Sequence, residues 1–118
     1  MSYKISIIKA LKRLEEAKYY SILQWNRIYH RNSINLAIKL MLEIPLEEAI
    51  ELVREKLPEY KYQPRNTEYT EKLVKSYKEG QISYQELRSL LRRHGIPEPY
   101  ILLSELLLRD NGFKPIIY

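Results

Sequence analysis

The chain has 118 residues, a net charge of +5, no cysteine, and 45% hydrophobic against 30% charged residues. This length and balance fit a single globular domain over residues 1–118 and exclude a disordered tail. The lack of cysteine excludes disulfides and thiolate metal sites. Ser104 and Glu105 interrupt the longest apolar run, so no stretch predicts a membrane span, and we expect a cytoplasmic protein.

Apolar residues recur at helical spacing through the first half of the chain, and no strand alternation or hairpin signal interrupts them. We expect a first helix over residues 6–20 and a second helical stretch over residues 21–30. Asn32 or Ser33 is expected to cap the next helix, because a short polar side chain at that position accepts bonds from the first free backbone amides. That helix should end before Pro45, since the residue preceding a proline disfavours helix.

The second half of the chain predicts four more helices, separated by proline and glycine. Ser83 followed by Glu86 is a capping box, the clearest local signal in the chain. The segment 59–65 is expected to be a loop, and the tail 113–118 to be extended. The four helices run from Pro45 to Pro58, from Asn66 or Thr67 to Gly80, from Ser83 to Gly95, and from Pro99 to Arg109. The whole pattern predicts an all-α fold, a compact bundle of six or seven short helices.

Charge is distributed in blocks. Residues 1–42 carry a net +6, residues 43–59 a net −4, and residues 60–95 a net +4. If the fold brings the two basic blocks together, they form a patch that attracts phosphate. The alternative is a set of separate, solvated lysines on helix surfaces.

Catalytic chemistry is not evident in the sequence. There is no glycine-rich phosphate loop, and the two histidines, His30 and His94, lie far apart without a metal-ligand pattern. Asp110 is the only aspartate, and adjacent glutamates diverge by roughly 100° around a helix, so they do not share one site. We therefore expect a chain that is not an enzyme by itself and has no intrinsic cofactor.

Three clusters are candidates for binding nucleic acid or nucleotides, because aromatic faces stack on bases and cations pair with phosphate. Each has a structural alternative: a core position for the aromatic residues, above all for Trp25 as the only tryptophan, a solvated helix face for the lysines, and complementation of the helix dipole for the arginines. The first cluster is Trp25, Arg27, Tyr29, His30, Arg31 and Asn32; the second is Arg65, Asn66, Tyr69, Lys72 and Lys75; the third is Arg92 and Arg93 with Arg88.

The order of several of these parts resembles the primase C-terminal helical domain. Arg31 and Asn32 precede the segment 34–42, then come the Leu46-Glu47-Glu48-Ala49 stretch, a loop with Pro64, and a segment 69–78 that contains Val-Lys-Ser. The resemblance covers about residues 30–80. The matched segment is similar to the helix bundle domain of primase-polymerase replication proteins from archaeal plasmids. The composition of the chain, rich in Ile, Lys, Glu and Tyr, favours a thermophilic source.

The resemblance implies a fragment of a larger replication protein whose catalytic primase-polymerase domain lies elsewhere. It implies binding of single-stranded DNA template and of nucleotides, with ATP or another nucleoside triphosphate and its Mg as ligand, to assist primer initiation. Two other readings stay open. One is a helical protein-interaction or structural module in which the apolar segment 101–108 mediates self-association. The other is a helix-turn-helix regulator whose recognition helix begins at Ser83, although its basic residues lie at the wrong end for reading bases.

Overall fold

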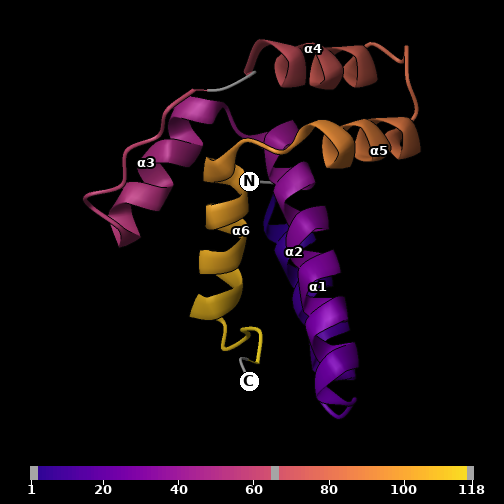
Figure 1. The fold of residues 1–118 in the computed structure, drawn as a ribbon, viewed down its shortest axis with the longest axis vertical. Coiled ribbons are helices and arrows are strands. Elements are labelled where there is room, and N and C mark those ends of the chain that lie inside the picture. The colour runs from indigo at the N-terminus through magenta and orange to yellow at the C-terminus, as the bar shows by residue number, and fades with distance from the viewer. Residues whose placement is uncertain (1–2, 65–66, 117–118) are drawn as a thin grey trace.

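The structure is a computed structural model that describes residues 3–64 and 67–116. It is all-helical in the part of the chain that it describes, and the prediction of an all-α bundle is confirmed (Figure 1). None of the described helices is long and apolar enough to cross a lipid bilayer. The six helices are α1 Tyr3–Ala17, α2 Ile22–Glu43, α3 Leu46–Lys56, α4 Thr67–Lys78, α5 Tyr84–His94 and α6 Glu98–Asp110.

The long α2 is the central support of the bundle, and it replaces the two shorter helices expected there. Ser21 caps it, with Ser21 Oγ accepting from Gln24 N at 3.3 Å. The predicted cap at Asn32 or Ser33 is wrong, because both residues are buried inside the helix. No proline or glycine lies between residues 22 and 43, so nothing stops the helix once Ser21 has started it. The predicted stop before Pro45 is confirmed, with Ile44 as the C-cap.

The body of the bundle consists of α1, α2, α3 and α6. α6 packs on both α2 and α3, and Figure 1 shows it lying between them. Two hydrogen bonds fix its position on α2. Ser33 Oγ and Ser104 Oγ lie 3.0 Å apart in the core, and the Tyr100 hydroxyl donates to Ile44 O at 2.8 Å.

The α4–α5 hairpin lies across the end of this body, with each of its helices packed mainly on the other (Figure 1). The predicted capping box is confirmed, since Glu86 N donates to Ser83 Oγ and Ser83 N donates to Glu86 Oε1. Gly95 ends α5 with a φ of 101°, a conformation that side-chain-bearing residues rarely adopt. Leu73, Leu87 and Leu91 join the hairpin to the common hydrophobic core.

The tail after α6 runs back along the start of α2. Trp25 Nε1 donates to Lys114 O at 3.0 Å, and the Asn26 side chain donates to Ile116 O and accepts from Ile116 N. The Trp25 ring also packs 6.0 Å from the Phe113 ring, centroid to centroid. Trp25 is therefore a core residue that fastens the C-terminal segment to the bundle.

Candidate nucleic-acid interface

A basic groove lies where α1, α2 and α5 meet. Its volume is about 350 Å³. Four of its lining side chains are cationic and none is acidic. α1 contributes Ser6, Lys9, Ala10 and Arg13; α2 contributes Asn32, Asn35, Leu36 and Lys39; α5 contributes Tyr84 and Arg88.

None of the four cations of the basic groove forms an ion pair with a carboxylate of the described residues. The ion pairs in the described part of the chain involve other lysines, namely Lys18, Lys56 and Lys75. Like charges that face one groove repel one another unless an anion lies between them, and a concave, low-dielectric wall strengthens the field they share. The basic groove is therefore built to attract an anion.

Tyr84 holds one of these cations in place. The Lys39 Nζ lies 4.2 Å from the centroid of the Tyr84 ring, a cation–π contact between α2 and α5. Tyr77 of α4 packs edge-on against the Tyr84 ring, with ring centroids 5.8 Å apart and an interplanar angle of 65°. Burial raises the pKa of the Tyr84 hydroxyl, so the ring stays neutral at physiological pH.

The floor of the basic groove is polar. Asn32 Nδ2 donates to Ile28 O at 2.8 Å, which satisfies that amide within α2. Asn35 Oδ1 is buried and has no hydrogen-bond partner within the described residues. A buried acceptor without a partner costs free energy of folding, about 1–3 kcal/mol. The Asn35 amide is therefore the least satisfied polar group at this site.

The first predicted cluster divides into a buried and an exposed half. Trp25 and Tyr29 are buried in the hydrophobic core, and Asn32 is buried at the floor of the basic groove. Arg27, His30 and Arg31 are exposed on the same helix. The free helix N-terminus expected beside them does not exist, because α2 is continuous there.

The exposed arginines of α2 lead toward the basic groove. Arg27, Arg31, Asn35 and Lys39 follow one another at intervals of four residues, so successive side chains are neighbours on the helix surface. Asn35 and Lys39 line the basic groove itself. The arginines therefore extend its positive charge along α2.

The second predicted cluster lies on α4. Tyr69 is 40% exposed and packs edge-on against His94 of α5, with ring centroids 4.8 Å apart. Lys72 is exposed and lines a shallow pocket together with Tyr69. Lys75 is exposed and pairs with Glu79, Nζ to Oε1, at 3.9 Å. Arg65 and Asn66 lie outside the described residues.

The arginines of the third predicted cluster lie in two different turns of α5. Arg92 and Arg93 are exposed in the last turn, where they complement the helix dipole. Arg88, one turn earlier, lines the basic groove instead. Arg88 comes from the second basic block of the sequence, and Lys9, Arg13 and Lys39 come from the first. The fold thus brings the two blocks together at this groove.

Three of the groove cations, Lys9, Arg13 and Lys39, were not among the predicted site residues. The spacing of Lys9 and Arg13, four residues apart on the polar side of a helix, was the available signal. Lys39 continues the four-residue spacing of Arg31 and Asn35, but that spacing does not indicate its groove neighbours from α1 and α5. Only the packing of the three helices shows that these side chains share one site.

The described residues contain no group of three or more His, Asp or Glu side chains that could hold a metal ion. Comparison with models of protein families, with curated proteins and with solved structures finds no match to this chain.

Proposed function

We propose that this chain is a helix bundle that binds single-stranded DNA and nucleotides and assists primer initiation by a DNA primase-polymerase. Synthesis would take place in a separate catalytic domain, and ATP or another nucleoside triphosphate with Mg would be a ligand and not a resident cofactor. The resemblance of residues 30–80 to the primase C-terminal helical domain supports the primase setting. The basic groove supports the binding of phosphate-bearing ligands.

The observation that carries the proposal is the convergence of four cations without a lining carboxylate. Scattered surface lysines on a helical protein usually alternate with acids, as Lys75 and Glu79 do on α4. Lys9, Arg13, Lys39 and Arg88 come from three helices and line one groove. Phosphate is the common anion that such a groove fits, because arginine and lysine donate to its oxygens from several directions.

The exposed residues of the predicted clusters have roles consistent with this function. Arg27 and Arg31 would continue the phosphate path along α2, and Lys72 would hold a phosphate on α4. Tyr69 with His94 offers an exposed aromatic surface for a base. Trp25 and Tyr29 have no such role in this proposal, because they are buried in the core.

A single strand fits the surface better than a duplex. A helix-turn-helix protein that binds double-stranded DNA inserts the N-terminal end of its recognition helix into the major groove. The first turn of α5 contains Glu86, and two of its three arginines, Arg92 and Arg93, lie in the last turn. A flexible strand can follow cations on α1, α2 and α5, whereas a rigid duplex cannot enter a concave groove of this size.

Fluorescence anisotropy of labelled single-stranded and double-stranded oligonucleotides, over a salt series and with or without ATP, tests the proposal. We expect saturable binding of the single strand that weakens with salt and tightens with ATP. Equal or tighter binding of the duplex would instead favour a duplex-binding regulator. No binding at low salt would overturn the nucleic-acid function.

A protein-interaction module is the second candidate, and one observation favours it. The tip of the α1–α2 hairpin exposes apolar side chains, with Tyr19 85% and Leu23 56% exposed. The segment 101–108, expected to mediate self-association, is packed in α6 against α2 and α3, with Leu103 and Leu108 buried. Stable association through the tip, without binding of oligonucleotides, would support this second function.

A further inference from the structure

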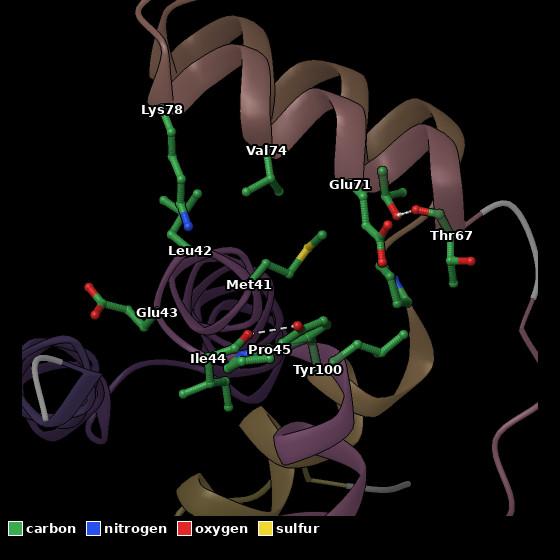
Figure 2. Close-up of a pocket in the computed structure, with 13 residues that line it drawn as sticks. Met41, Leu42, Glu43, Ile44, Pro45, Thr67, Glu71, Val74, Lys78 and Tyr100 are labelled. Atoms are coloured by element: carbon green, nitrogen blue, oxygen red, sulfur yellow. Dashed lines mark hydrogen bonds between the residues drawn. The ribbon is translucent and has the colours of Figure 1, made fainter.

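A second pocket, of about 340 Å³, lies between the α4–α5 hairpin and the body of the bundle (Figure 2). It shares no lining residue with the basic groove. Its size falls within the range of small-molecule sites, about 300–1,000 Å³. The lining comes from the end of α2, the start of α3, one face of α4 and the start of α6, and it includes Met41, Pro45, Glu71, Val74, Lys78 and Tyr100.

The pocket is apolar in the middle and charged at two ends. Figure 2 shows Val74 of α4 facing Met41 of α2 across the apolar centre. Glu71 and Lys78 extend from α4 on either side of Val74 (Figure 2). They are seven residues apart, nearly two full turns, so they lie on one face of the helix and about 10 Å apart along its axis. The site therefore presents an acceptor and a cation separated by apolar surface.

Both charges are available to a ligand. Neither Glu71 nor Lys78 takes part in an ion pair or a side-chain hydrogen bond with another described residue, whereas Lys75 and Glu79 on the same helix pair with each other. The Glu71 carboxylate lies close enough to Tyr100 to raise the pKa of its hydroxyl, although burial is the larger cause. Glu43, the other acid of the lining, turns its carboxylate away from Val74 and Met41 in Figure 2.

We propose that this pocket binds one nucleotide, with an exocyclic amino group of the base at Glu71 and the phosphate at Lys78. The inference rests on the proposed nucleic-acid function and adds a base preference to it. A nucleotide has a donor at one end, a flat apolar middle and an anion at the other end, in the order that the pocket presents. A free amino acid carries its two charges too close together to reach both ends.

The pocket should prefer bases that carry an amino group. A glutamate carboxylate accepts from the cytosine amino group, and adenine and guanine have amino groups as well, whereas thymine has none. Cytosine and thymine are pyrimidines of similar size, so stacking is similar for the two, while thymine has a carbonyl oxygen in place of the amino group, which the Glu71 carboxylate would repel. A free nucleotide and a nucleotide within a strand offer the same chemistry, and the experiment separates them.

The main test measures the affinities of oligodeoxycytidine and oligothymidine, each of about twelve residues, a length that one small domain can cover. We expect the cytidine strand to bind about tenfold more tightly. Glu71→Leu should bring the ratio of the two affinities to about one. Glu68→Leu is the matched control, because it removes the same charge from an exposed position on α4 outside the pocket, and it should keep the ratio.

A second measurement locates the ligand. Titration with deoxycytidine monophosphate should shift the methyl NMR signals of Met41 and Val74, and Lys78→Met should weaken that binding. Lys75→Met removes a lysine that lies outside the pocket lining and should leave it unchanged. If these methyl signals shift with the DNA strand but not with the free nucleotide, the pocket binds a nucleotide within the template strand.

The outcomes separate this inference from the proposed function. Salt-sensitive binding of both strands with equal affinity, and no effect of Glu71→Leu on their ratio, would overturn the nucleotide pocket and leave the basic groove in place. If neither strand binds at low salt, both the nucleotide pocket and the proposed function are overturned. A ratio near ten that is lost in Glu71→Leu and kept in Glu68→Leu would establish the pocket.

Discussion

The Lys39 Nζ of α2 lies 4.2 Å from the centre of the Tyr84 ring of α5. The contact joins the α4–α5 hairpin to the body of the bundle at the edge of the basic groove. It also fixes a lysine that forms no ion pair with a carboxylate in the described part of the chain. Tyr84 thus acts as a positioning residue for the cation in our account.

Substitution of Tyr84 tests this role. We expect Tyr84→Leu to weaken binding of single-stranded DNA about two- to fivefold, because a cation–π contact stabilises by about 0.5–1 kcal/mol. Tyr84→Phe keeps the ring and should bind like the unmodified protein. In a Lys39→Met background, Tyr84→Leu should cause no further loss. A loss of equal size in that background would show that Tyr84 acts on the fold and not through Lys39.

Much of the fold follows from local signals in the sequence. Proline positions, the Ser83–Glu86 capping box and the glycine stops gave α3 to α6 within a few residues of their observed bounds. The error at Asn32 and Ser33 has a physical cause. Both residue types favour a cap when a helix begins, but inside a helix that has already begun, their side chains bond to nearby carbonyls or across the core.

The site was harder to predict than the fold. Trp25 and Tyr29 look like stacking residues in the sequence, and the structure places them in the core because they share one face of α2 with Leu36. The basic groove depends on which polar faces of α1, α2 and α5 meet. Which faces meet is determined by packing between helices that are distant in sequence, so the spacing of residues within one helix cannot predict it.

The buried hydroxyl pair of Ser33 and Ser104 gives a prediction about stability. Ser104 Oγ donates to Ile101 O at 2.7 Å, which leaves the Ser33 hydroxyl to donate to Ser104 Oγ. We expect Ser33→Ala to lower the free energy of unfolding by about 1 kcal/mol, measured by urea denaturation. A double replacement of both serines by alanine should cost little more than the larger single change, because no buried hydroxyl is then left without a partner. Additive losses would contradict this pairing.

Alkaline pH should destabilise the bundle through Tyr100. Burial, with the negative charge of Glu71 as a further cause, raises the pKa of its hydroxyl to about 12. A phenol whose pKa is higher in the folded state than the ordinary value near 10 stabilises the fold fully below pH 10. This contribution is lost as the pH rises from about 10 to about 12, and it is on the order of 2 kcal/mol.

The variant Tyr100→Phe isolates this effect. It removes the hydrogen bond to Ile44 O, so the protein should be less stable than the unmodified chain at pH 7. Its free energy of unfolding should fall less steeply between pH 10 and pH 12. Parallel curves for the two proteins over that range would show that Tyr100 does not govern the alkaline transition. Tyr60, whose pKa is also raised, remains in both proteins and cancels in the comparison.

The salt dependence of single-strand binding tests the central claim most directly. Arg13→Gln with Arg88→Gln removes two groove cations, and Lys18→Gln with Lys56→Gln removes two lysines that pair with acids outside the groove. Each phosphate contact adds about 0.7 to the steepness with which log affinity falls against log salt concentration. The slope of the groove variant should therefore be smaller by about 1.4. Its affinity at about 50 mM salt should be at least tenfold lower. The control variant should keep nearly the full slope. Equal slopes in the two variants would contradict the assignment of phosphate binding to the basic groove.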